Sequence, residues 1–185
     1  ALHVWPLVET GKIGTLEGPI TGQPDVFDIV IHGRGGHAAA PQLSIDPIVV
    51  GAHFVSQVQS IVSRRVDPLQ RAVVSVTQFH GGTTHNVIPA DVSIQGTVRT
   101  FDKGVQAFIR VELEKVLKAC CDSAGATYEL KYIEGYPSTL NAVSATQNVV
   151  KATTRLLGES RLEYPVMATM GGEDFAYYSQ KIPAC

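Results

Sequence analysis

The stretch DVFDIVIHGRGGHAAAP, residues 25 to 41, joins a period-two apolar pattern directly to a turn rich in glycine and alanine. Phe27, Ile29 and Ile31 alternate with other side chains, which is typical of a strand with one buried face. His37 stands alone among the small residues of the turn. Three interpretations are open for this turn: a phosphate-binding loop, a catalytic histidine, or a histidine that only packs on its own loop.

The residues after this turn continue as a regular series of helices and strands. Asp46 and Pro47 are typical of a helix N-cap and first position, and Gly125 is typical of a left-handed C-cap. The predicted elements are a strand at 25–32, a helix from 46 to 65, strands at 71–80 and 91–101, a helix from about 105 to 125, and a strand at 127–136. This order predicts an α+β, ferredoxin-like unit in which four mostly antiparallel strands carry two helices on one face.

The remaining residues belong to a different part of the fold. Residues 1–20 are expected to form a strand and a connection rich in glycine and proline, 141–158 a helix, and MATMGGEDFAYYSQKIP a glycine turn followed by an aromatic-rich helix. The sequence therefore predicts a ferredoxin-like domain at 21–137, inserted between pieces of another domain at 1–20 and 138–185. Both ends look cut, and we expect the chain to be a segment of a longer protein.

Composition limits the functional classes. The formal net charge is −2 and 17% of the residues are charged, which describes an ordinary globular protein with no basic footprint for nucleic acid. No apolar run approaches the roughly 18 residues that span a bilayer, and no signal peptide opens the chain. Three cysteines without metal-type spacing favour buried thiols, so a reducing cytoplasm is expected.

GRGGHA, residues 33–38, nearly matches the dinucleotide-binding fingerprint. Several loop residues separate it from the next predicted helix, so no helix N-terminus would lie under a pyrophosphate. The surrounding strand order is also antiparallel rather than doubly wound. We therefore disfavour nucleotide binding.

Four other residues are candidates whose patterns alone leave a structural interpretation open. Asn86 lies in the loop GGTTHNVIP, where its amide could meet a carboxylate or bond its own turn. Arg99 lies on a polar strand face and has a fork suited to carboxylates. His3 lies in the apolar context ALHVWP, and Glu173 follows two glycines at an expected helix start.

Six motifs occurring in this order resemble one family. They are ALHVWP, GRGGHAAAP with DPI, HGGTTHNVIP, GTVRTFD, GYPSTLN and MGGEDFAYY. Together they resemble the dinuclear-metal amidohydrolase branch of the aminoacylase/carboxypeptidase family. Its members include hippurate hydrolases, N-acyl-amino-acid amidohydrolases and plant indole-acetyl-amino-acid hydrolases. The resemblance covers essentially the whole chain and does not reach a particular substrate.

The resemblance implies an α/β, zinc-peptidase-like catalytic domain with two divalent metals (zinc, manganese or cobalt) and an inserted ferredoxin-like lid that dimerises. It implies that His3 is a metal ligand on the strand before the lid. It also implies that His37 stabilises the tetrahedral intermediate, often in the partner subunit's site. Asn86 and Arg99 would hold the substrate carboxylate, and Glu173 would have a supporting role near the site.

The chain departs from the family pattern in one respect. The H-x-C-G-H-D segment, the paired glutamates that include the general base, and a closing histidine ligand are absent from these 185 residues. The resemblance implies that the parent protein hydrolyses N-acyl-amino acids or peptides next to a free carboxylate. The segment itself is expected to be inactive and to hold no metal tightly. The alternative is a stand-alone ferredoxin-like dimerisation or binding module without catalysis.

Overall fold

The computed structural model describes all 185 residues and divides into two compact units. Unit 1 comprises Ala1–Pro24 and Gly135–Cys185, and unit 2 comprises Asp25–Glu134. The boundaries expected from the sequence, after residues 20 and 137, differ from these by a few residues. The first boundary lies later because β2 (Gly18–Thr21) pairs with β9 (Thr139–Asn141) and so stays with unit 1.

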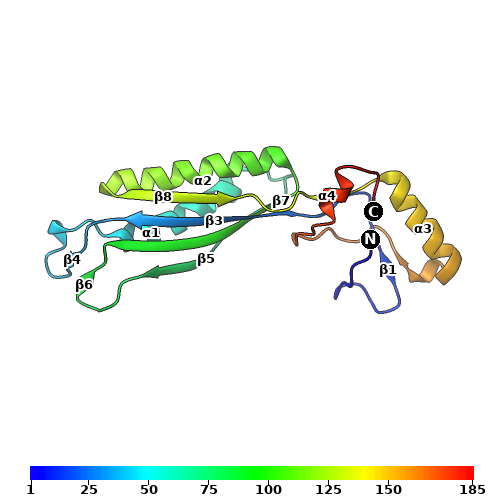
Figure 1. Cartoon of the computed structure of the whole chain (residues 1–185), viewed down its shortest axis with the longest axis horizontal. Coiled ribbons are helices and arrows are strands. Elements are labelled where there is room, and N and C mark those ends of the chain that lie inside the picture. The colour runs from blue at the N-terminus through cyan, green and yellow to red at the C-terminus, as the bar shows by residue number, and fades with distance from the viewer. The chain divides into compact units, whose positions relative to one another are not determined.

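Unit 2 is a four-stranded sheet with two long helices, as Figure 1 shows. The sheet has the order β5-β7-β3-β8, with β3–β8 and β5–β7 antiparallel. The α+β, ferredoxin-like prediction is therefore confirmed. The elements of unit 2 are β3 (Gln23–His32), β4 (Gly36–His37), η1 (Pro41–Leu43), α1 (Pro47–Ser60), η2 (Ile61–Arg65), β5 (Ala72–Gly81), β6 (Val87–Ile88), β7 (Asp91–Thr100), α2 (Lys103–Ala124) and β8 (Thr127–Ile133).

The alternation in β3 separates a buried face from an open face. Phe27, Ile29 and Ile31 are at most 1% exposed, whereas the side chains between them are only partly covered or exposed. The buried side chains of β3, α1 and α2 belong to one apolar cluster, so both helices cover the same face of the sheet. The other face of the sheet is polar along β7. Its residues on β7 are Asp91, Ser93, Gln95, Thr97 and Arg99.

The start of α1 and the end of α2 lie at the residues that the sequence indicates. The Asp46 carboxylate accepts a hydrogen bond from the backbone N–H of Ile48, and Pro47 is the first residue of α1. Gly125 ends α2 with φ 72°, in the left-handed region that favours glycine. The helix expected to run to Arg65 ends as α1 at Ser60 and continues as one π turn, η2.

A buried carboxylate lies at the Asp25 end of unit 2. Asp25 is 1% exposed and accepts hydrogen bonds from Gln106 Nε2 at 2.9 and 2.8 Å and from the Tyr132 hydroxyl at 2.6 Å. These groups come from β3, α2 and β8. The network therefore joins three elements at the place where the chain enters and leaves unit 2.

The two strands that lead into and out of unit 2 are direct neighbours. β3 pairs with β8 from Val26↔Ile133 to His32↔Thr127. β8 and β5 are the two edge strands of the sheet. Unit 2 therefore begins and ends on one antiparallel pair of strands.

Two short segments expected to be a turn and a loop form a ribbon instead. β4 pairs antiparallel with β6, with Gly36 opposite Ile88 and His37 opposite Val87. Figure 1 shows this tip ribbon (β4 and β6) beyond the His32 end of β3. The segment after β4 leads to the short turn η1 before α1 begins at Pro47.

The elements of unit 1 are shorter: β1 (Ile13–Gly14), β2, β9, α3 (Val143–Leu157), η3 (Glu159–Arg161), β10 (Leu162–Glu163) and α4 (Ala176–Ser179). The helix predicted at 141–158 is α3, and the aromatic-rich helix is the single turn α4. The strand predicted near His3 is wrong, because residues 1–12 form turns and irregular backbone with no strand partner. None of the helices in the chain combines the length and the apolar character that crossing a bilayer requires.

Candidate functional site

His37 lies on the exposed tip ribbon of unit 2. Its Nδ1 accepts a hydrogen bond from the backbone N–H of Ala39 at 3.1 Å. The next turn is closed by the Ala40 N–H, which donates to the His37 carbonyl at 2.9 Å. A Cβ on Gly36 would lie 2.5 Å from the Ser44 hydroxyl, so a larger residue there would require the Ser44 side chain to move. The imidazole therefore stands on a constrained backbone with Nε2 free of any partner in the chain.

Asn86 belongs to the same ribbon. Its backbone carbonyl accepts the Ala38 N–H at 3.0 Å, next to the His37↔Val87 pair. Its side-chain Oδ1 accepts a hydrogen bond from the Thr84 hydroxyl at 3.3 Å. The structure thus brings together His37 and Asn86, which are 49 positions apart in the sequence.

Arg99 lies at the other end of the sheet. It stands on β7 opposite Val73 of β5, and its Nε donates to the Thr97 hydroxyl at 3.1 Å. Thr97 in turn donates to the Asp25 carbonyl at 2.7 Å, so the guanidinium is anchored near the end of the strand. Asp91, at the start of β7, is eight residues away, which is about 26 Å at roughly 3.3 Å per residue. One copy of unit 2 therefore does not bring Arg99 to the tip ribbon.

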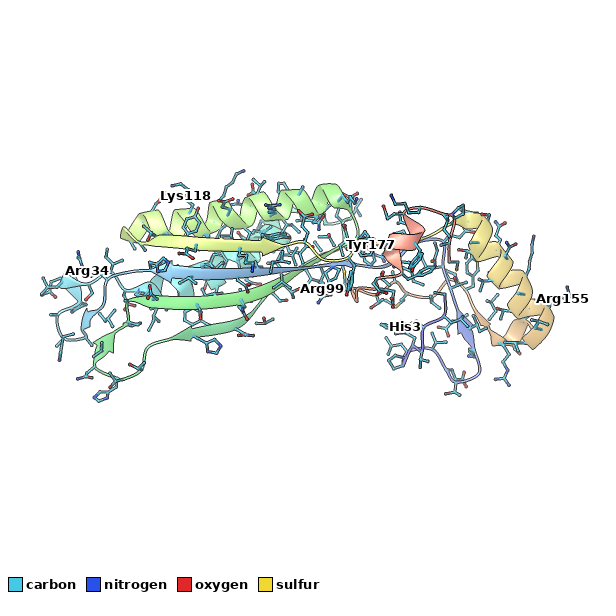
Figure 2. The ribbon with its side chains drawn as sticks, in the orientation of Figure 1. His3, Arg34, Arg99, Lys118, Arg155 and Tyr177 are labelled. Atoms are coloured by element: carbon cyan, nitrogen blue, oxygen red, sulfur yellow. The ribbon has the colours of Figure 1, made fainter.

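His3 and Glu173 come together in unit 1. The distance between His3 Nε2 and Glu173 Oε2 is 3.5 Å. Trp5 packs edge-on against the imidazole, with the two ring centroids 5.7 Å apart. His3 Nδ1 lies 2.6 Å from the carbonyl of Val4, which can only accept, so Nδ1 carries the proton of this hydrogen bond and Nε2 is the nitrogen that a metal could bind. Figure 2 labels His3 and Arg99 on their respective units. Trp5 is a neighbour of the site that the sequence did not single out.

The donor set of the chain does not complete a metal site. No group of three or more His, Cys, Asp or Glu side chains is arranged to hold a metal ion. The pair His3 and Glu173 offers one nitrogen and one carboxylate, whereas a catalytic zinc site uses three protein ligands. The residues present therefore do not fit a dinuclear centre by themselves.

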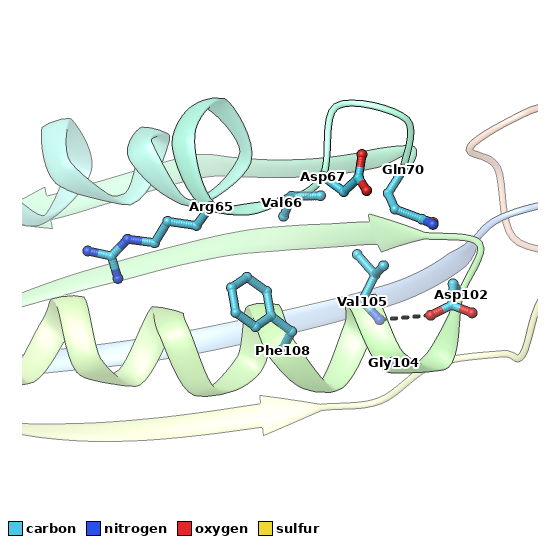
Figure 3. Close-up of a pocket in the computed structure, with 8 residues that line it drawn as sticks. All are labelled: Arg65, Val66, Asp67, Gln70, Asp102, Gly104, Val105 and Phe108. Carbon is cyan, nitrogen blue, oxygen red and sulfur yellow. Dashed lines mark hydrogen bonds between the residues drawn. The ribbon is translucent and has the colours of Figure 1, made fainter.

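An open pocket of about 260 Å³ lies elsewhere in unit 2. Figure 3 shows that it lies between η2 and the start of α2, where Asp102 caps the N–H of Val105. Its lining residues are Arg65, Val66, Asp67, Gln70, Asp102, Gly104, Val105 and Phe108. None of the five sequence-predicted site residues contributes to it.

A histidine between two carboxylates was missed by the sequence analysis. His32 Nδ1 lies 2.6 Å from Asp91 Oδ1, and its Nε2 lies 3.5 Å from Glu129 Oε1. The hydrogen bond to Asp91 raises the pKa of His32, and the nearby Glu129 charge acts in the same direction. The three residues lie on different strands, so no spacing along the chain could have indicated them.

A family model supports the assignment of unit 2. The model described as a peptidase dimerisation domain (M20_dimer) matches residues 26–129.

Two named hydrolases are similar to most of the chain. An N-acyl-L-amino acid amidohydrolase from Geobacillus stearothermophilus is 48% identical over 75% of this chain and 38% of the relative. Thermostable carboxypeptidase 1 from Saccharolobus solfataricus is 36% identical over 98% of this chain and 46% of the relative. The chain thus spans less than half the length of these two curated relatives.

A solved structure is similar to nearly the whole chain. The Bacillus subtilis YXEP protein, described as a dinuclear metal binding peptidase from the M20 family, matches with a TM-score of 0.76 and 33% identity. The match covers 98% of this chain and 44% of that protein.

Proposed function

Because the chain belongs to the M20 peptidase family through its peptidase dimerisation domain, we propose that it is part of a metal-dependent amidohydrolase. The substrate class is an N-acyl-amino acid or a peptide, cleaved at the amide bond next to a free carboxylate. The observation that carries the proposal is the ribbon that joins His37 and Asn86, because it presents two polar groups at the exposed end of a dimerisation domain. The similarity to an amidohydrolase and a carboxypeptidase supports the reaction class.

Each candidate residue has a role that suits its chemistry. His37 donates a hydrogen bond to the oxyanion of the tetrahedral intermediate, where charge develops in the transition state. Arg99 and Asn86 bind the substrate carboxylate, and the anchoring of Arg99 by Thr97 orients its fork. Glu173 supports the site next to His3.

The metals belong to the full-length enzyme in this proposal. Two divalent ions, zinc, manganese or cobalt, would take His3 as one ligand and the remaining ligands from segments outside these 185 residues. The 185-residue chain alone is therefore expected to show no turnover of hippurate or N-acetyl amino acids when these metals are added. Turnover at a rate typical of enzymes would refute that expectation.

We propose a homodimer formed through the β5 edge of unit 2. β5 has ten residues without a single Asp, Glu, Lys or Arg, whereas the other edge strand, β8, carries Glu129 and Lys131. Charged side chains on an edge discourage pairing with another strand. Val73 and Phe79 of β5 are each 37% exposed, which adds apolar area at the same edge. The pairing partner is a second copy of this chain.

Antiparallel pairing of two β5 strands solves the separation between Arg99 and the tip ribbon. Gly81 of β5 lies opposite Val92 near the tip, and Ala72 lies opposite Thr100 near Arg99. In an antiparallel pair, the Gly81 end of one copy lies beside the Ala72 end of the other. His37 and Asn86 of one subunit would then act on the substrate carried near Arg99 of the other.

The test is subunit mixing in the full-length enzyme. His37→Ala should lower kcat by roughly 10²–10³-fold, the scale for losing an oxyanion donor. Arg99→Ala should mainly raise KM, by roughly the 1.5–3 kcal/mol of a charge-assisted hydrogen bond. Mixing the two variants should restore about a quarter of the wild-type kcat/KM, because half of the dimers then contain one intact composite site out of two.

Two results would contradict these roles. A near-wild-type kcat for His37→Ala would remove the oxyanion role. A mixture no more active than its two components would place all three residues in one subunit.

The second candidate is a dimerisation module without catalysis, which the uncharged β5 edge also favours. Light scattering of the chain should show a dimer under both proposals. If the protein is only a dimerisation module, its full-length form hydrolyses no N-acyl-amino acid, whichever metal is added. Activity of the full-length protein therefore separates the two.

A further inference from the structure

The tip ribbon supplies hydrogen bonds to the acceptor atoms of both functional side chains. His37 Nδ1 receives the Ala39 N–H at 3.1 Å, and Asn86 Oδ1 receives the Thr84 hydroxyl at 3.3 Å. In both cases the donor is two residues away along the chain. The two residues are then linked through the Ala38 N–H and the Asn86 carbonyl.

The bond to His37 selects one tautomer. A neutral imidazole has one nitrogen that donates and one that accepts, and the hydrogen bond at one nitrogen decides the state of the other. Since Nδ1 accepts from a backbone N–H that cannot reverse its role, the proton of neutral His37 is on Nε2. The exposed edge of the ring is therefore a donor.

The structure orients the Asn86 amide with its oxygen toward the Thr84 hydroxyl. A hydroxyl can donate to an amide oxygen or accept from an amide nitrogen, so this contact is compatible with the orientation and does not impose it. In this orientation the Thr84 hydroxyl donates to Oδ1, and the NH₂ group of Asn86 points away from Thr84. The free side of this amide is also a donor.

We propose that Thr84 and the backbone N–H of Ala39 are positioning groups that make the tip ribbon a donor-only surface for an oxygen carrying negative charge. This inference deepens the proposed function and rests on it. A carboxylate or an oxyanion only accepts hydrogen bonds, so it meets two donors without a competing acceptor. An amide group of the substrate is bound less well, because neither side chain offers an acceptor to its N–H.

The first test uses the 185-residue chain and needs no turnover. Amide hydrogen exchange is measured by NMR at pH 8 for Ala39 and Ala40 in the wild type and in His37→Phe. Loss of the imidazole acceptor should speed exchange at Ala39 by about three- to tenfold, the range for one net hydrogen bond. Ala40 is the internal control, because its N–H donates to the His37 carbonyl, which the substitution keeps. Unchanged exchange at Ala39 would overturn the proposal.

A second measurement covers the case in which His37→Phe opens the ribbon and both amides exchange faster. The wild-type chain is labelled with ¹⁵N-histidine, and long-range proton–nitrogen correlations give the protonated nitrogen of each ring. His37 should be more fully in the Nε2–H tautomer than His53, which lies on the exposed side of α1 and makes no hydrogen bond within the chain. Equal tautomer populations at the two positions would overturn the assignment.

Thr84 is tested in the full-length enzyme. Thr84→Val keeps the shape and removes the hydroxyl, and should weaken the site by about three- to tenfold in kcat/KM. Thr84→Ser should restore it, and Thr83→Val is the matched control because the Thr83 hydroxyl makes no hydrogen bond within the chain. Equal effects of the two valine variants, or no rescue by serine, would refute a positioning role.

The effect of Thr84→Val also tells which anion Asn86 contacts. A rise in KM at constant kcat indicates the substrate carboxylate, whereas a fall in kcat indicates the oxyanion. Failure of the proposed function would appear as an active His37→Ala enzyme. Failure of the present inference would appear in the exchange and tautomer data of the chain, which do not depend on catalysis.

Discussion

The buried hydrogen bond between Tyr132 and Asp25 gives a prediction that can be worked out from the structure. Tyr132→Phe keeps the ring on β8 and removes the hydroxyl that donates to Asp25 Oδ2 at 2.6 Å. Asp25 is 1% exposed, so water cannot readily replace the lost donor. The carboxylate keeps both contacts with Gln106 Nε2, so it is not left without a hydrogen-bond donor.

The expected loss of folding stability follows from the one hydrogen bond that is removed and the two that remain. A hydrogen bond to a charged group contributes about 1.5–3 kcal/mol, and the remaining Gln106 contacts place the loss near the lower end of this range, about 1.5–2 kcal/mol. The assay is urea unfolding of the chain at pH 7, followed by far-ultraviolet circular dichroism. Tyr128→Phe on the same strand is the control, because the Tyr128 hydroxyl makes no hydrogen bond, and its loss should stay within about 0.5 kcal/mol.

Alkaline pH gives a second measurement of the same contact. Burial, and next the hydrogen bond to Asp25, raise the pKa of Tyr132 above the ordinary value of about 10. The folded chain therefore keeps this proton at a pH where the unfolded chain has lost it, so stability falls as the pH rises past about 10. Tyr132→Phe should make this fall less steep. Equal losses for Tyr132→Phe and Tyr128→Phe at pH 7 would refute the reasoning.

Three other perturbations test separate parts of the structure. Gly96→Ala should destabilise unit 2 by about 1–3 kcal/mol in urea unfolding, because the new Cβ would lie 2.1 Å from the Phe27 ring; a loss below about 0.5 kcal/mol would contradict this packing. Because the bond to Asp91 raises the pKa of His32, its contribution is full below about pH 6.5 and is lost as the pH rises through the folded-state value. His32→Gln should therefore lose stability at pH 5.5 and little at pH 9, and an equal loss at both would be inconsistent with it. Burial raises the pKa of Cys121 to about 11, so a thiol reagent at pH 8 should modify only one of the three cysteines until the chain is unfolded.

Most of unit 2 was predictable from local signals. The alternation in β3, the cap formed by Asp46 and Pro47, and the left-handed Gly125 each depend on a few neighbouring residues. The structure follows these local signals because the same residues also place the apolar side chains of each element on its buried face. Together they were sufficient to order four strands and two helices.

The tip ribbon was not predictable in the same way. β4 and β6 have two residues each, which is too short for any periodicity, and they pair across about 50 positions of sequence. The expected strand near His3 failed for a related reason. A short apolar alternation forms a strand only where another strand is available beside it.

The sequence motifs proposed the candidate site residues as a set, and they left the positions of these residues relative to one another open. The motifs suggested His37, Asn86 and Arg99 together, but nothing in their spacing indicates that Arg99 lies at the opposite end of the sheet. Likewise, the contact between His3 and Glu173 joins the two ends of the sequence. The Thr84 and Ala39 hydrogen bonds depend on local turn geometry, which the residue types alone leave open.

The pairing of Val26 with Ile133 has a consequence for how this architecture can be assembled. Paired residues in antiparallel strands have Cα atoms only about 4.5–5.5 Å apart, so the chain leaves unit 1 and returns to it across the width of a hairpin. The entropy of closing a loop depends on how far apart its ends are held, and here the folded insert holds them together itself. For the folding of unit 1, residues 25–134 therefore act as a short turn rather than a long loop. A tight turn that replaces residues 25–134 would connect positions 24 and 135 across the same short distance. Unit 2 could therefore be exchanged for such a turn.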